Sequence, residues 1–99
     1  MKHISPEELK QRIGDGQLFL LDVREETEHQ EFNIGGKLIP LGELMLHSNE
    51  IPLDQPVVVY CKKGIRSQIA IQKLEEKLGL SNLINLKGGI DAWKRIFDL

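Results

Sequence analysis

Short, mostly apolar runs alternate along the chain with segments in which apolar residues recur every three or four positions. Two runs, at 18–21 and 57–60, are uninterrupted and bounded by turn residues, which is typical of strands buried on both faces. Shorter strands are expected at 83–86 and 38–40. Apolar strands separated by helical patterns predict an α/β fold with a mainly parallel sheet.

The first helical segment carries a start signal. Ser5 is a good N-cap, Pro6 suits the first helical position, and Glu8 is placed to close a capping box. We therefore expect a helix that runs to Ile13 and stops near 14–16. Further helical segments are expected at 25–32, 42–47 and 90–97.

The longest helix is expected at 66–78, where Gly79 provides a stop signal. Its spacing of apolar residues predicts that one face packs on the sheet. The residues assigned to that face are Ile69, Ala70, Leu74 and Leu78.

Composition narrows the class of protein. The chain has 99 residues, of which 40% are hydrophobic and 28% charged, so we expect a single domain over 1–99 and a monomer. A net charge of −2 argues against nucleic acid as a partner. No apolar stretch approaches membrane-spanning length and no apolar leader is evident, so we expect a cytoplasmic protein without membrane contact.

Residues with charged or reactive side chains follow three of the expected strands. Asp22, Cys61 and Lys87 each lie at or just after a strand end. In parallel sheets, ligands bind beyond the carboxyl ends of the strands. These three residues are therefore expected at one edge, which becomes the candidate site.

Cys61 is the only cysteine of the chain, and three cations follow it closely: Lys62, Lys63 and Arg66. A thiol between a strand end and a helix start meets unpaired N–H groups, a positive helix terminus and these charges, all of which favour the thiolate nucleophile. Two plainer readings remain open: an inert core thiol and an ordinary solvated lysine pair.

A single cysteine excludes an internal disulfide and a cysteine-rich metal site. His3, His29 and His47 fall in different expected elements, without metal-ligand spacing. We expect all three at the surface, with none serving as a base for Cys61, and we expect no metal or cofactor.

The segment Cys61-Lys62-Lys63-Gly64-Ile65-Arg66-Ser67 resembles the active-site loop of the rhodanese family. Leu20-Leu21-Asp22-Val23-Arg24-Glu25 is similar to that family's Asp-Val-Arg segment, and 83–93 is similar to its carboxyl-terminal signature. The three segments lie in the family's order. The chain departs from the pattern at Asn33 and Gly35, where the family usually has histidine and proline.

The resemblance implies a three-layer rhodanese-like fold with a mainly parallel, five-stranded sheet. It also implies a thiosulfate sulfurtransferase in which Cys61 takes sulfur from a small donor as a persulfide and passes it to cyanide or a thiol. The anion-binding loop would comprise Lys62, Lys63, Gly64, Ile65, Arg66 and Ser67, with Arg66 near the donor's sulfonate. Asp22 and Arg24 would brace this loop.

Two other functions stay open. One is a rhodanese-related phosphatase or arsenate reductase. Such phosphatases carry one extra loop residue, whereas the spacing here is Cys-x4-Arg, which leaves a smaller bowl, and arsenate reductases use a second thiol that these 99 residues lack. A non-catalytic binding module is the second alternative. Because the chain has no second thiol, a persulfide on Cys61 would be discharged by an outside acceptor.

Overall fold

The computed structural model describes residues 1–99 and contains one five-stranded sheet. Its strands are β1 (Lys2–Ile4), β2 (Phe19–Asp22), β3 (Lys37–Leu38), β4 (Val57–Tyr60) and β5 (Leu83–Leu86). They are ordered β1-β5-β4-β2-β3, and every neighbouring pair is parallel. The parallel α/β fold predicted from the sequence is confirmed.

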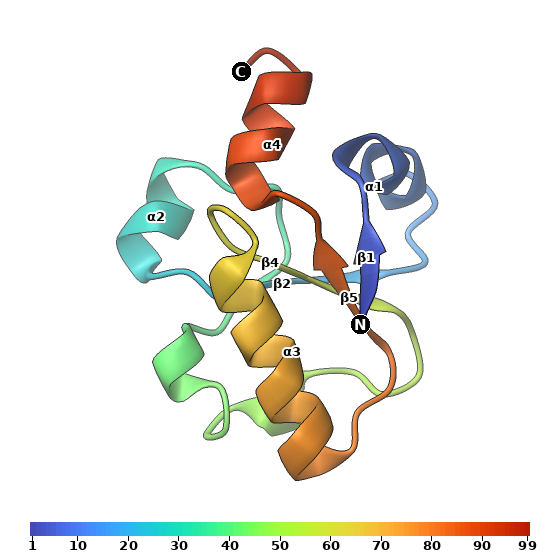
Figure 1. Cartoon of the computed structure of the whole chain (residues 1–99), viewed down its shortest axis with the longest axis vertical. Coiled ribbons are helices and arrows are strands. Elements are labelled where there is room, and N and C mark those ends of the chain that lie inside the picture. The colour runs from blue at the N-terminus through green and yellow to red at the C-terminus, as the bar shows by residue number, and fades with distance from the viewer.

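The chain forms four α-helices, of which the last follows the final strand: α1 (Pro6–Ile13), α2 (Glu26–Glu31), α3 (Ile65–Leu78) and α4 (Gly89–Ile96). Figure 1 shows α1 and α4 side by side and α3 packed separately against the sheet. None of these helices is both long and apolar enough to cross a membrane.

Two apolar clusters make up the core, one on each face of the sheet. The first joins α3 and the 39–51 segment to the sheet, and the second joins α1 and α4 to it. Strand β4 contributes to both clusters: Val57 and Val59 enter the first, and Val58 and Tyr60 enter the second. All four side chains are fully buried, as expected for a central parallel strand covered on both faces.

Local start and stop signals act where the sequence predicts them. The Ser5 hydroxyl accepts a hydrogen bond from the Glu8 N–H at 3.2 Å, and Pro6 is the first residue of α1. Only this half of the predicted capping box forms. Helix α3 ends at Gly79, whose φ of 68° is the left-handed conformation that glycine adopts without strain.

Three expectations were wrong. The helix expected at 42–47 is replaced by two 3-10 turns, Leu41–Glu43 and Ser48–Glu50. Strand β1 was missed because two of its three residues are exposed and polar, so no apolar run marks it. On α3, Ile69 and Leu78 are 39% and 47% exposed, and Ile71 faces the core.

Candidate active site

Strand β4 delivers Cys61 to the carboxyl edge of the sheet, and α3 starts four residues later. The thiol is almost completely buried. Its Sγ accepts hydrogen bonds from the N–H of Gly64 at 3.1 Å and from the N–H of Ser67 at 3.3 Å. Gly64 adopts a φ of 93°, which turns the loop back over the sulfur. The loop thus encloses Cys61 with backbone donors of the kind that stabilise an anion.

Ser67 contacts the thiol with its side chain as well as its N–H. The Cys61 thiol donates to the Ser67 Oγ at 3.3 Å, and that hydroxyl in turn donates to Oδ1 of Asn85. Ser67 and Asn85 are both fully buried. Sequence reasoning missed Asn85, because a lone asparagine within a short strand carries no chemical signature.

The amino end of α4 supports the other side of the loop. The N–H of Ile90 donates to the Cys61 carbonyl and that of Asp91 to the Lys62 carbonyl, both at 2.9 Å. A Cβ on Gly89 would overlap these two carbonyl oxygens, and Gly89 has a φ of 60°. The glycine at this turn is therefore required by the close approach of the active-site loop.

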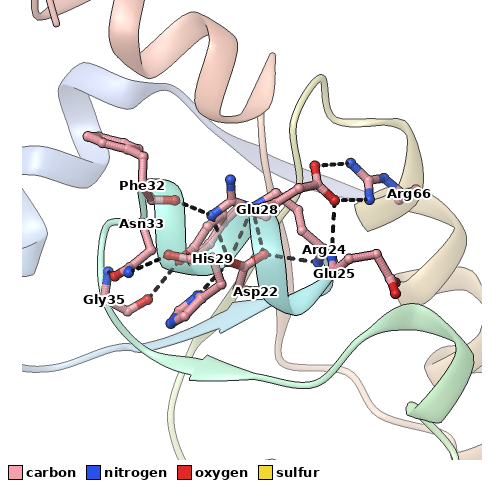
Figure 2. Close-up of polar contacts among 10 residues, drawn as sticks. Asp22, Arg24, Glu25, Glu28, His29, Phe32, Asn33, Gly35 and Arg66 are labelled. Atoms are coloured by element: carbon pink, nitrogen blue, oxygen red, sulfur yellow. Dashed lines mark hydrogen bonds and ion pairs between the residues drawn. The ribbon is translucent and has the colours of Figure 1, made fainter.

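The basic side chains of the loop are largely paired with carboxylates. Both terminal nitrogens of Arg66 donate to the two oxygens of Glu28 at 2.8 Å, as Figure 2 shows. This pairing lowers the pKa of Glu28 to about 2 and raises the pKa of Arg66. Lys62 forms an ion pair with Asp91 at 3.1 Å, and Lys63 forms none. Only one of the three predicted loop cations is therefore without a carboxylate partner.

Asp22 and Arg24 form a buried ion pair beside the loop. The Arg24 Nε donates to Asp22 at 2.9 Å, and its terminal nitrogen bridges Asp22 and the Phe32 carbonyl (Figure 2). Neither residue hydrogen-bonds to the Cys61 loop. They hold the segment that carries α2, and α2 in turn presents Glu28 to Arg66.

The expectation that all three histidines lie at the surface was wrong for His29. The ring of His29 is 21% exposed, and its Nδ1 lies 2.8 Å from an oxygen of buried Asp22. His3 is exposed and His47 is partly exposed, and both have hydrogen-bond partners. None of the three hydrogen-bonds to the Cys61 sulfur.

The two departures from the family pattern act together. The Asn33 side chain donates to the His29 carbonyl at 2.9 Å and accepts from the Gly35 N–H at 2.8 Å. A proline at position 35 has no N–H to donate. The Gly35 carbonyl also accepts from the hydroxyl of Tyr60, whose pKa is raised by burial. Local hydrogen bonds therefore hold this segment in place.

Cys61 lies at a cavity of about 280 Å³. The cavity is lined by Cys61, Lys62, Lys63, Ile65 and Arg66. Ile65 is 63% exposed at this opening and adds an apolar edge to a mainly basic rim. The arrangement suits a nucleophilic sulfur that meets a small anion, with a size limit set by the short loop.

This chain is similar in sequence and in fold to known proteins. A family model described as "Rhodanese-like domain" matches residues 5–96. A sulfurtransferase of Allochromatium vinosum is 36% identical over 96% of this chain and 90% of its own length. The thiosulfate sulfurtransferase GlpE of Coxiella burnetii is 32% identical over 94% of this chain and 87% of its own. A rhodanese-related protein of Thermoplasma volcanium has a similar structure, with a TM-score of 0.86, 30% identity, and coverage of 97% and 93%.

Proposed function

Because the chain belongs to the rhodanese-like domain family, we propose that it is a sulfurtransferase in which Cys61 carries the sulfur as a persulfide. The observation that supports this most directly is the setting of Cys61. Cys61 lies at a cavity, and its sulfur already accepts two backbone hydrogen bonds, from Gly64 and Ser67.

In the first half-reaction the Cys61 thiolate attacks the outer sulfur of a donor such as thiosulfate. A bond forms between Sγ and that sulfur, the sulfur–sulfur bond of the donor breaks, and sulfite leaves with the electron pair. The backbone donors of the loop stabilise the anionic sulfur before the attack. Lys63 attracts the anionic donor because no carboxylate neutralises its charge.

In the second half-reaction an acceptor attacks the outer sulfur of the persulfide and releases the Cys61 thiolate. Cyanide would leave as thiocyanate, and a thiol would leave as a new persulfide. The 99 residues contain one cysteine, so the acceptor comes from outside them. We therefore propose ping-pong kinetics, in which the donor product leaves before the acceptor binds.

The proposal is tested by intact mass after the reduced protein is incubated with thiosulfate or with a small persulfide. We expect a gain of one sulfur, about 32 Da, as required for a covalent intermediate on the nucleophile. The gain should be absent in Cys61→Ser. It should disappear on addition of cyanide, with one thiocyanate formed for each sulfur lost.

A protein that alkylates normally at Cys61 but gains no sulfur from either donor would contradict the proposal. Turnover of an aryl phosphate by that same protein would favour phosphatase chemistry. A protein that neither gains sulfur nor turns over the aryl phosphate would favour a non-catalytic binding module. The bidentate ion pair of Arg66 with Glu28 argues against phosphatase chemistry. Both terminal nitrogens of the guanidinium, which would bind a phosphoryl group, are already bonded to Glu28.

A further inference from the structure

A buried line of polar groups leads from Cys61 through the sheet to its edge. It passes from Ser67 to Asn85, and from the Asn85 Nδ2 to the Nδ1 of His3 at 3.2 Å. Asn85 and His3 are directly opposite one another in the β1–β5 register. Leu83, two residues before Asn85 on the same face of β5, belongs to the apolar core. A buried amide in such surroundings must be hydrogen-bonded at both ends.

The direction of these hydrogen bonds follows from counting hydrogens. The Ser67 hydroxyl has one hydrogen, and the Asn85 carbonyl oxygen can only accept, so the hydroxyl donates to Asn85. Ser67 is therefore an acceptor toward Cys61, which must supply its own thiol hydrogen. At the far end, the Asn85 amide donates to His3, whose Nδ1 carries no hydrogen. This direction suits the protonated thiol.

The thiolate requires the reverse direction. A sulfur anion has no hydrogen to donate, so the Ser67 hydroxyl is most useful when it turns toward the sulfur. Asn85 then loses its donor. A half-turn of its amide presents Nδ2 to the Ser67 oxygen and Oδ1 to His3. That orientation needs a hydrogen on the Nδ1 of His3, which a protonated imidazole always carries.

We propose that Asn85 and His3 are positioning residues for Cys61, which set whether the Ser67 hydroxyl accepts from the thiol or donates to the sulfur anion. This inference rests on the function proposed for Cys61 and deepens it. No proton passes along the line: the thiol hydrogen leaves to solvent, Ser67 keeps its hydrogen, and His3 takes one from water. Protonation of His3 thereby favours the reactive form of a sulfur that it does not touch.

The charge of His3 is set at the opposite end of the sheet from the thiol loop. His3 lines a separate cavity of about 600 Å³ at the amino ends of β4 and β5. Two cations and two carboxylates share this cavity with it: Lys2, Arg12, Glu8 and Asp54. The cavity opens to solvent, so His3 can exchange protons while Asn85 stays dry.

The test is the rate of Cys61 alkylation by iodoacetamide between pH 5 and pH 9, which needs no sulfur transfer. The Asn85→Leu substitution removes the acceptor that holds the Ser67 hydroxyl away from the sulfur. At the acidic end of this pH range, we expect Asn85→Leu to be alkylated about fivefold faster than the wild type. This factor is equivalent to about 1 kcal/mol, the contribution of one neutral hydrogen bond. An unchanged or slower rate in the folded variant would overturn the inference.

The matched control repeats Asn85→Leu in a Ser67→Ala background. If Asn85 acts through the serine hydroxyl, its substitution should now change the alkylation rate less than twofold, because the relaying group is gone. A fivefold effect that persists without the hydroxyl would show that Asn85 acts by another route, and would also overturn the inference.

If Asn85→Leu does not fold, the His3→Leu variant tests the same inference. His3 is exposed on an edge strand, so His3→Leu leaves the core intact. The ratio of the wild-type to the His3→Leu alkylation rate should rise about fivefold from pH 8 to pH 5. In the Ser67→Ala background this ratio should be flat. If this rate ratio did not change with pH while Ser67 is present, or if it rose in the Ser67→Ala background, the proposed role of His3 would be contradicted.

Discussion

Lys63 differs from its neighbours around Cys61 in having no carboxylate partner. Lys62 is matched by Asp91, and Arg66 by Glu28. All three cations line the cavity, but a cation beside a carboxylate contributes little net field at a short distance. We therefore propose that the attraction of an anionic donor depends mainly on Lys63, although the sequence presents the two lysines as equivalent.

Lys63→Ala is expected to raise the KM for thiosulfate about threefold, because the unmatched charge is lost. Lys62→Ala is the matched control and should change this KM little, since it removes one member of a neutralised pair. Steady-state kinetics with thiosulfate and with an uncharged alkyl persulfide measure the difference. Equal effects of the two substitutions would contradict this assignment.

Helix α2 depends on polar contacts at the scale of the element. None of its six residues is buried, so it has no apolar face to anchor it. Its position is instead held by the Arg24 bond to Phe32 at its carboxyl end, by the Glu28–Arg66 pair, and by the contact of His29 with Asp22 (Figure 2). The second contact links α2 to the first turn of α3, and therefore to the loop around Cys61.

Glu28→Gln is expected to lower the free energy of unfolding by about 1 kcal/mol at pH 7, the upper range for a partly exposed pair. The pKa of Glu28 lies at about 2 in the folded protein, below its ordinary value of 4.5. The pair therefore stabilises the fold above pH 4.5, and this contribution is lost as the pH falls toward 2.

Urea unfolding of the two proteins at pH 7, 4 and 3 measures this contribution. The difference between wild type and Glu28→Gln should shrink at pH 4 and further at pH 3. Glu31→Gln, on the same helix but outside any ion pair, is the control and should show no such trend. A difference that is constant with pH would show that the carboxylate charge is not responsible.

The helical pattern placed α3 within one residue but assigned part of its inner face wrongly. Ile69 and Ile71 are both apolar, and only the packing of the helix on β4 and β5 selects Ile71 for the core. Helical periodicity locates the buried face of a helix only approximately when further apolar residues flank that face. Element type was therefore predictable here, and the exact buried set was not.

The whole molecule is organised around β4, which is shared by the two apolar clusters. Its neighbouring residues Val58 and Val59 belong to different clusters on opposite faces of the sheet (Figure 1 shows the strand at the centre). The same strand ends at Cys61. Loss of packing on either face should therefore weaken the whole domain together, and the site with it.

Val58→Ala and Val59→Ala are each expected to lower the free energy of unfolding by about 2 kcal/mol, because each removes fully buried methyl groups. Trp93 reports on the second cluster alone. Its fluorescence transition in urea should nevertheless coincide with the far-UV circular dichroism transition in both variants. Separate transitions in Val59→Ala would show that the two faces unfold independently.

The sequence by itself predicted most of the elements and the candidate site. Buried strands at 18–21 and 57–60, the stop at Gly79 and the loop from Cys61 to Ser67 are all marked by neighbours within a few residues. The meeting of Asp22, Cys61 and Lys87 at one edge also followed, because parallel strands bring their carboxyl ends together.

The tertiary structure alone decided the partners of those residues. The contacts Ser67–Asn85, Lys62–Asp91 and Arg66–Glu28 join positions 18, 29 and 38 residues apart. Nothing in the sequence shows that Arg66 pairs with Glu28 rather than with another glutamate of that segment, because a cation pairs with whichever carboxylate the fold places nearest. The charge and hydrogen-bond direction around Cys61 are set by such distant neighbours, because electrostatic interactions depend on distance in space rather than separation along the chain.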